Sequence, residues 1–228
     1  MRIRYLVTQA YGFYHCMHGV DIISQYKDWF LYWNIERLLR DSDSVLDLGC
    51  GESSPISRIK KHFTSVGVDV YRPSIVKSNK LNIHDRYILC DLLSIDKKIK
   101  SKSFDAVILL DVVEHFSKRD GLRLLKQAER VARKKIVVLT PNPYYRQDEL
   151  GGNPYQLHKS GWKLTDFQNR GYYIRGLRGW KSLRREYATI YLKPWLFWAT
   201  LSFLSEPLLY FLPEASYHFL AVKRLNHE

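Results

Sequence analysis

Val45-Leu46-Asp47-Leu48-Gly49-Cys50-Gly51 is the most informative stretch of this chain for its architecture. Its first four residues form a short apolar run, and the two glycines that follow allow the backbone to turn sharply and a ligand to approach the main chain. Ser53-Ser54-Pro55 then supplies a helix cap and a proline suited to the first helical position. The pattern predicts a buried strand, a tight turn and the start of a helix.

The same alternation continues along the chain. The other apolar runs are rich in valine, isoleucine and leucine with no polar face, which is typical of parallel strands covered by helices on both sides. Strands that alternate with helices predict an α/β fold with a doubly wound sheet. The further strands are expected at residues 65–70, 87–91, 105–111, 135–140, 171–176 and 217–224, and helices at residues 20–40, about 118–133 and 160–170.

Length and composition indicate one globular domain. The chain has 228 residues, of which 46% are hydrophobic and 26% are charged, and these values exclude a disordered protein. The formal net charge of +13 is high. It indicates a polyanionic neighbour such as RNA, an acidic lipid surface or a phosphorylated substrate, or else a solubilising surface.

The cysteines and the N-terminus indicate a cytoplasmic protein. Cys16, Cys50 and Cys90 are far apart and form no CxxC pair, so we expect neither a zinc site nor a disulfide framework. No metal is predicted. The apolar residues at the N-terminus are too few for the apolar region of a signal peptide.

Four acidic residues stand at or just after the ends of four successive predicted strands. They are Asp47, Asp69, Asp91 and Asp111. Because the carboxyl ends of parallel strands form the ligand crevice of an open sheet, these side chains predict a polar binding edge. Asp69 follows Gly51 by 18 residues, close to the spacing at which an acidic residue reaches ribose hydroxyls. The ligand is therefore expected to carry a nucleoside.

The glycine turn favours one nucleoside ligand over another. A nicotinamide dinucleotide needs a third glycine where this chain has Ser54, and Asp47, just before the glycines, would repel its pyrophosphate. A ligand with a sulfonium and an amino group tolerates this carboxylate. The electrostatics favour S-adenosylmethionine.

Two motifs resemble those of a known family. Residues 45–51 resemble the first motif of class I S-adenosylmethionine-dependent methyltransferases, and Phe104-Asp105-Ala106-Val107 through Asp111-Val112-Val113-Glu114-His115-Phe116 resembles the fourth-strand motif of the type 11 branch. The resemblance spans about residues 40–143. It implies a Rossmann-like, mostly parallel seven-stranded sheet with an antiparallel last strand and a helical insert between strands six and seven. Ser53 departs from the glycine that many members have there.

The resemblance also implies roles for individual residues. Asp47, Gly49 and Gly51 would line the methionine part of the cofactor, with Asp111 near the same end. Asp69 would hold the ribose hydroxyls, and Asp91 with the Leu92 backbone would meet the adenine.

His115 is the candidate catalytic base. The reaction would be an in-line displacement at the methyl group, and a base is needed only for a hydroxyl or protonated-amine acceptor. The unperturbed pKa of histidine lies near neutrality, and His115 follows the fourth predicted strand. The alternative is a histidine that only shapes the loop.

The division expected for the single domain is an N-terminal helical cap (1–40), a cofactor-binding core (41–143), an acceptor-side segment (144–176), an aromatic helical insert (177–215) and the last strand (216–228). Arg175, Arg178, Lys181, Arg184 and Arg185 lead into the insert with no acid among them. Neither apolar block of the insert reaches the length of about 20 residues that spans a bilayer. Four roles of the insert stay open: contact with the inner face of an anionic membrane, a homodimer interface, a lid over the acceptor, or plain core packing.

The leading functional hypothesis is methylation of a small-molecule, lipid-linked or saccharide acceptor. An RNA methyltransferase is the second, suggested by the charge, although no RNA-binding module is recognisable. A cofactor-binding scaffold without catalysis is the third.

Overall fold

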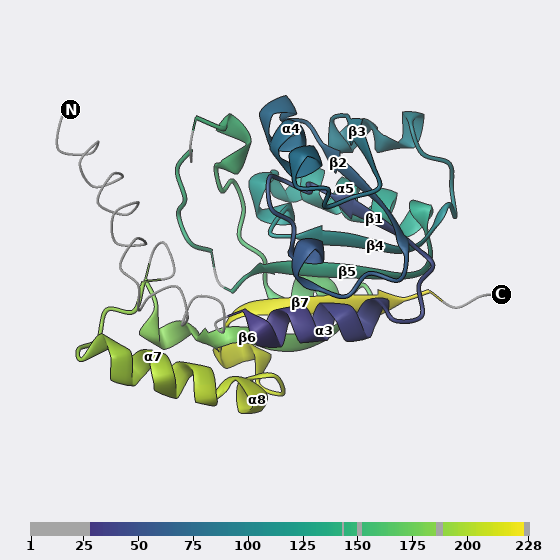
Figure 1. Ribbon diagram of the computed structural model, residues 1–228. Helices are drawn as coiled ribbons and strands as arrows, with labels where there is room; N and C mark the ends of the chain where they lie inside the picture. The colour runs from purple at the N-terminus through teal and green to yellow at the C-terminus, as the bar shows by residue number, and fades with distance from the viewer. Residues whose placement is uncertain (1–27, 143, 150–151, 186–188, 226–228) are drawn as a thin grey trace.

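A seven-stranded sheet forms the centre of the molecule (Figure 1). This computed structural model describes residues 28–142, 144–149, 152–185 and 189–225. The strand order is β3-β2-β1-β4-β5-β7-β6. The strands are β1 Ser44–Leu48, β2 Thr64–Asp69, β3 Arg86–Leu89, β4 Phe104–Leu110, β5 Ala132–Pro141, β6 Tyr173–Trp180 and β7 Ser216–Arg224.

The sheet is parallel apart from its last strand. β1 to β5 pair in parallel, and β7 lies between β5 and β6 and is antiparallel to both. β6 therefore runs in the same direction as β1 to β5. This arrangement confirms the predicted Rossmann-like sheet with an antiparallel last strand.

The helices lie on both faces of the sheet. They are α3 Trp29–Leu39, α4 Arg72–Lys80, α5 Lys118–Val131, α6 Leu164–Gln168, α7 Trp195–Leu204 and α8 Glu206–Leu209. Short 3-10 segments are η1 Pro55–Arg58, η2 Leu92–Lys97, η3 Val113–His115, η4 Pro154–Gln156, η5 Lys181–Leu183 and η7 Pro213–Ala215.

The predicted helices differ from the structure in extent. The helix expected after Ser54 is only the turn η1, although Ser54 caps it and Pro55 begins it as predicted. The helix expected over 160–170 is the short α6. The helix expected over 20–40 is described only in part, as α3, because residues 1–27 lie outside the described residues.

The sheet has one apolar core on each face. Leu124, Leu125, Ala128 and Val131 recur at helical spacing on α5 and pack with apolar residues of β1, β2, β4 and β5. On the opposite face, α3 packs through Leu31, Ile35 and Leu39. Because both faces are covered, the central strands β1 and β4 direct buried apolar side chains into both cores.

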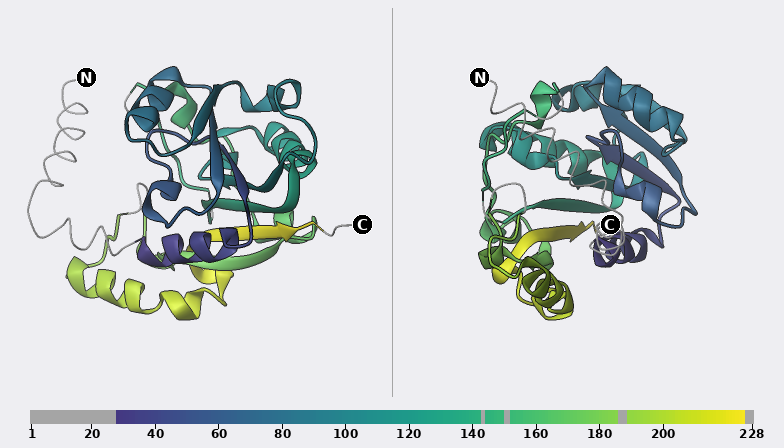
Figure 2. Two further views of the ribbon diagram at one scale, coloured as in Figure 1. Left: turned by 45° about the vertical axis from the view of Figure 1, so that its right-hand side comes forward. Right: turned by 60° about the vertical axis from the view of Figure 1, so that its left-hand side comes forward.

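The insert between β6 and β7 lies at the β6 end of the molecule (Figures 1 and 2). α7 and α8 pack on β6, where close approach of the backbones requires glycine. A Cβ atom added to Gly176 would lie 2.2 Å from the carbonyl oxygen of Leu209, and one added to Gly179 would lie 2.0 Å from Ser202 Oγ. Among the described residues, no helix is both long and apolar enough to cross a membrane.

We expect Gly176→Ala to lower the free energy of unfolding by about 3 kcal/mol, the upper end of the usual cost of overpacking, because the methyl group forces α8 away from β6. Urea unfolding would measure the loss. Gly152→Ala is the matched control: it also adds a methyl group, at φ +74° and with no atom within 4 Å, so it should cost only the left-handed strain of about 1 kcal/mol. Equal losses in the two variants would contradict the close packing of α8 on β6.

Candidate functional site

The glycine turn after β1 is left-handed at both glycines. Gly49 has φ +76° and Gly51 has φ +58°. A Cβ atom on Gly49 would lie 2.7 Å from Val112 Cγ2, whereas one on Gly51 would meet no atom within 4 Å. The turn is thus packed against the segment after β4 on one side and open next to Gly51 on the other.

Asp47 lies in β1 directly before this turn, and its side chain is buried. It accepts a hydrogen bond from Ser54 Oγ at 2.5 Å, and His84 Nε2 lies 3.0 Å from the same carboxylate oxygen. His84 is itself buried, just before β3. The carboxylate is therefore held by two side chains of the protein. Sequence reasoning missed His84, and no spacing in the sequence marks it as a partner of Asp47.

Asp69 ends β2 and supports the glycine turn. Its carboxylate accepts hydrogen bonds from the backbone N–H of Gly51 at 2.9 Å and of Tyr71 at 2.8 Å. The pKa of Asp69 is raised, mainly because burial disfavours the charged form. Hydrogen bonds from the backbone oppose this shift, and the nearby Asp47 adds to it. An acidic group is thus fixed beside the open side of Gly51.

Asp91 and Leu92 follow β3 by a short loop. Asp91 is exposed, and its Oδ1 accepts a hydrogen bond from the backbone N–H of Leu93 at 2.9 Å. Leu92 is buried at the start of η2. Asp91 is the most exposed of the four predicted acids.

Asp111 follows β4 and forms an ion pair that sequence reasoning did not foresee. Arg178 Nη1 of β6 lies 3.0 Å from Asp111 Oδ2, and Arg178 Nε lies 3.2 Å from Asp28 Oδ1. Arg178 Nη1 is also 3.1 Å from His218 Nε2. Burial would raise the pKa of Asp111, but Arg178 and then His218 hold it well below its usual value.

His218 of β7 is neutral at pH 7 in this group. Burial, followed by repulsion from Arg178, lowers the pKa of His218 from 6.5 to about 4, although Asp111 and Asp28 oppose the shift. His218 Nε2 lies between the two charged partners, 3.1 Å from Arg178 Nη1 and 3.2 Å from Asp111 Oδ1. Three strands, β4, β6 and β7, thus meet in one charged group.

His115 lies in η3, on the segment that leaves β4. Its Nδ1 is 3.2 Å from the carbonyl oxygen of Leu157, and its ring centroid is 5.0 Å from that of His158. Burial, and then His158, lower the pKa of His115 from 6.5 to about 4. His115 is therefore neutral at pH 7.

The four predicted acids all stand at the carboxyl edge of the parallel strands. Asp47, Asp69, Asp91 and Asp111 belong to or follow β1, β2, β3 and β4. Asp69 and the open side of Gly51 fit a ribose-bearing ligand, because a carboxylate stands beside a main chain that a ligand can approach. Asp47 and Asp111 add two more carboxyl groups to this edge. Asp47 is held by Ser54 and His84, and Asp111 is paired with Arg178.

The sequence matches a known methyltransferase-domain family. The profile of a methyltransferase-domain family, type 11, matches residues 46–139, which extend from β1 to β5. The uncharacterized protein MJ0638 of Methanocaldococcus jannaschii is 22% identical over 160 residues, which cover 68% of each chain.

Solved methyltransferases share the fold. A SAM-dependent methyltransferase from Archaeoglobus fulgidus aligns with a TM-score of 0.55 and 16% identity, over 85% of this chain and 94% of that one. The small RNA methyltransferase HEN1 aligns with a TM-score of 0.57 and 14% identity, over 90% of this chain but 25% of that one. At such identities the likeness shows the fold alone.

We expect the free energy of unfolding to fall as the pH is lowered from about 7 to about 4.5, because the unfolded chain binds about one more proton at position 218 than the folded chain does. The folded pKa of His218, about 4, lies below the unfolded value of 6.5, so this contribution to stability is lost on acidification. Urea unfolding at several pH values would measure the slope.

His218→Gln should give a shallower dependence on pH than the wild type. His62→Gln, which makes the same substitution at an exposed histidine, is the matched control. The same slope in the wild type and in His218→Gln would contradict the assignment of a neutral, buried His218.

Proposed function

Because this chain is a class I S-adenosylmethionine-dependent methyltransferase of the type 11 branch, we propose that it methylates a lipid-linked acceptor at an anionic membrane surface. S-adenosylmethionine is its cofactor and supplies an electrophilic methyl group on a sulfonium. The observation that carries the choice of acceptor is the exposed apolar surface of the insert.

That insert surface is formed by large apolar side chains on α7, α8 and the residues after α8. α7 carries no charged residue, and only Ser202 among its ten residues is buried. Soluble proteins rarely leave such a patch uncovered unless it binds something. The insert surface consists of Trp195, Leu196, Phe197, Phe203, Leu204, Leu208, Phe211 and Leu212, which are 39–68% exposed.

Basic side chains flank the insert surface. The Arg175 guanidinium lies 5.6 Å from the ring centroid of Phe211, and that of Arg185 lies 4.3 Å from the ring centroid of Tyr191. Lys193 is exposed just before α7. Apolar side chains next to cations suit the interface of an anionic bilayer, where the rings enter the headgroup region and the cations meet lipid phosphates.

The insert begins at the same edge of the sheet as the candidate cofactor site. β6 runs parallel to β1 to β5, so its carboxyl end, from which the insert continues, lies on the side of Asp69 and Asp111. Arg178 of β6 pairs with Asp111 across this edge. An acceptor held by a membrane at the insert would therefore approach the edge where the methyl donor binds.

We assign the cofactor to the glycine turn and the acids around it. In this assignment Asp69 binds the ribose hydroxyls, the backbone at the two glycines accommodates the methionine part, and Asp91 with Leu92 meets the adenine. The chain's task is then to align the acceptor and exclude water. The residues assigned are Asp47, Gly49, Gly51, Asp69, Asp91, Leu92 and Asp111.

RNA is the second candidate acceptor, favoured by the net charge of +13. An RNA substrate predicts binding that weakens steeply with salt. It does not require the exposed apolar side chains of α7, so substitutions there discriminate between the two acceptors.

We expect S-adenosylhomocysteine at about 100 times its Kd to stabilise the wild type by about 2.7 kcal/mol, which raises Tm by roughly 5–10 °C. Asp69→Ala and Gly49→Val should each abolish the shift, because one removes the ribose ligand and the other places a side chain against Val112. Asp96→Ala, at an exposed acid in η2, is the control and should keep it. Unchanged shifts in both site variants would refute the assignment.

We expect the protein to co-float at low salt with vesicles of phosphatidylglycerol and phosphatidylcholine, and not with phosphatidylcholine alone. Phe197→Ser with Leu204→Ser should weaken binding by at least about tenfold, because two exposed apolar side chains no longer enter the bilayer. Leu81→Ser is the matched control, since Leu81 is 65% exposed beyond α4. Absence of co-flotation by the wild type, or equal loss in the control, would end the membrane proposal.

A further inference from the structure

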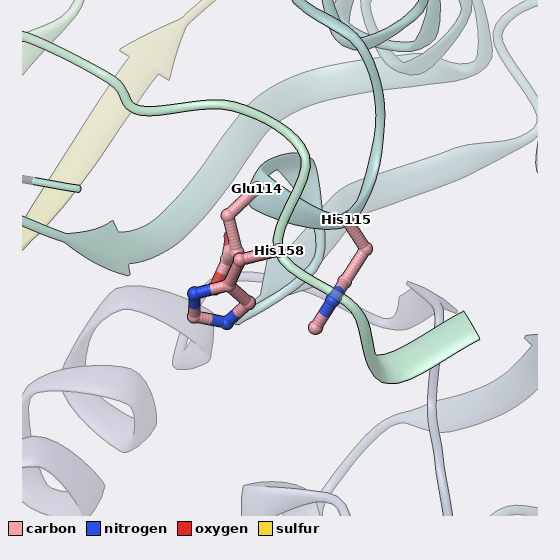
Figure 3. Close-up of side chains that lie close together, drawn as sticks. All are labelled: Glu114, His115 and His158. Carbon is pink, nitrogen blue, oxygen red and sulfur yellow. The ribbon is translucent and has the colours of Figure 1, made fainter. Parts of the chain in front are cut away.

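Glu114, His115 and His158 gather beside the segment that leaves β4 (Figure 3). Glu114 and His115 belong to η3, and His158 comes from the loop before α6. One ligand atom from each side chain can be chosen so that all three lie within 4.8 Å of one another. Two imidazoles and a carboxylate at this separation are a donor set that metal ions use.

Glu114 has a buried carboxylate oxygen without a hydrogen bond. The residue is 2% exposed, and its Oε2 accepts a hydrogen bond from Thr140 Oγ1 at 3.0 Å, whereas Oε1 has no partner among the described residues. Burial, and then the charge of Asp111, raise the pKa of Glu114, so its surroundings disfavour a carboxylate that has no cation next to it. A buried charge is costly unless it is paired or coordinates a metal.

The Nδ1 atom of each histidine lies next to a backbone carbonyl oxygen, which leaves Nε2 as the available donor atom. His115 Nδ1 lies 3.2 Å from the carbonyl oxygen of Leu157, and His158 Nδ1 lies 2.7 Å from that of Tyr145. A carbonyl oxygen only accepts, so each Nδ1 carries the proton and each Nε2 keeps a lone pair. Such outer hydrogen bonds orient the imidazoles of metal sites. Burial lowers the pKa of both side chains, which are therefore neutral at pH 7.

The backbone holds the two halves of the group together. The N–H groups of Lys159 and Ser160 both donate to the carbonyl oxygen of Glu114, at 2.8 and 3.1 Å. The loop that carries His158 is thus attached to the turn that carries the other two side chains. The donor set is arranged before any ion arrives.

We propose that Glu114, His115 and His158 bind a divalent first-row transition-metal ion. Two nitrogen donors favour ions such as Zn²⁺, Co²⁺ or Ni²⁺ over Mg²⁺ and Ca²⁺, which prefer oxygen ligands. Three protein ligands leave coordination positions open, as in catalytic rather than structural sites. This inference does not depend on the lipid-linked acceptor, and it gives His115 the role of a ligand in place of that of a base.

The test is a titration of the full chain, freed of metal with a chelator, with Co²⁺ and separately with Zn²⁺. Calorimetry would give stoichiometry and affinity, and the visible absorption of Co²⁺ would report nitrogen ligands and coordination number. We expect one ion per chain and much weaker binding of Mg²⁺. Binding of Mg²⁺ as tight as that of Co²⁺ would contradict the class of ion proposed.

Glu114→Gln and His158→Asn should each weaken binding by roughly 100-fold or more, since loss of an outer-shell partner alone costs about 10–100-fold. His62→Asn, at an exposed histidine, is the control and should bind as the wild type does. Thermal unfolding without metal would show that the variants fold. If one variant does not fold, the other alone tests the proposal. No binding by the wild type, or binding unchanged in both variants, would overturn the proposal.

Discussion

The left-handed turn at Gly49 and Gly51 organises the candidate site. Both residues have positive φ, and Gly49 has no room for a side chain beside Val112. The carboxylate of Asp69 accepts the Gly51 N–H, so the end of β2 fixes the turn that follows β1. Parallel pairing of these strands brings the two segments together. The open main chain and the acid next to it follow from this single arrangement.

The carboxyl edge of the sheet is built from charges that have partners. Asp47 is held by Ser54 and His84, and Asp111 by Arg178. Buried charges persist in proteins when they are paired and hydrogen-bonded. Glu114 differs from Asp111, whose pKa Arg178 lowers: burial and then the charge of Asp111 raise the pKa of Glu114, and no ion pair of Glu114 is found among the described residues. This contrast is why the metal proposal concerns Glu114 and not the acids nearer the glycine turn.

The insert differs physically from the rest of the fold. α3 and α5 bury their apolar faces on the sheet, whereas most of the large side chains of α7 remain exposed. Plain core packing, one of the alternatives open from the sequence, does not describe such a helix. Contact with a membrane, a second copy of the chain or a lid would each cover it, and the flanking cations favour the membrane.

Local sequence patterns were enough to predict the fold class and the positions of the acids. Residues 45–51 and the apolar runs predicted a parallel sheet with Asp69 near a glycine turn, because apolar periodicity and glycine conformation are local properties. Which side chains meet became visible only in the folded chain. His84 reaches Asp47 across 37 residues, and Arg178 reaches Asp111 across 67. The ring of His158 lies beside that of His115, although α5 and β5 separate them in the chain. Such contacts depend on strand order and loop path, which no local pattern encodes.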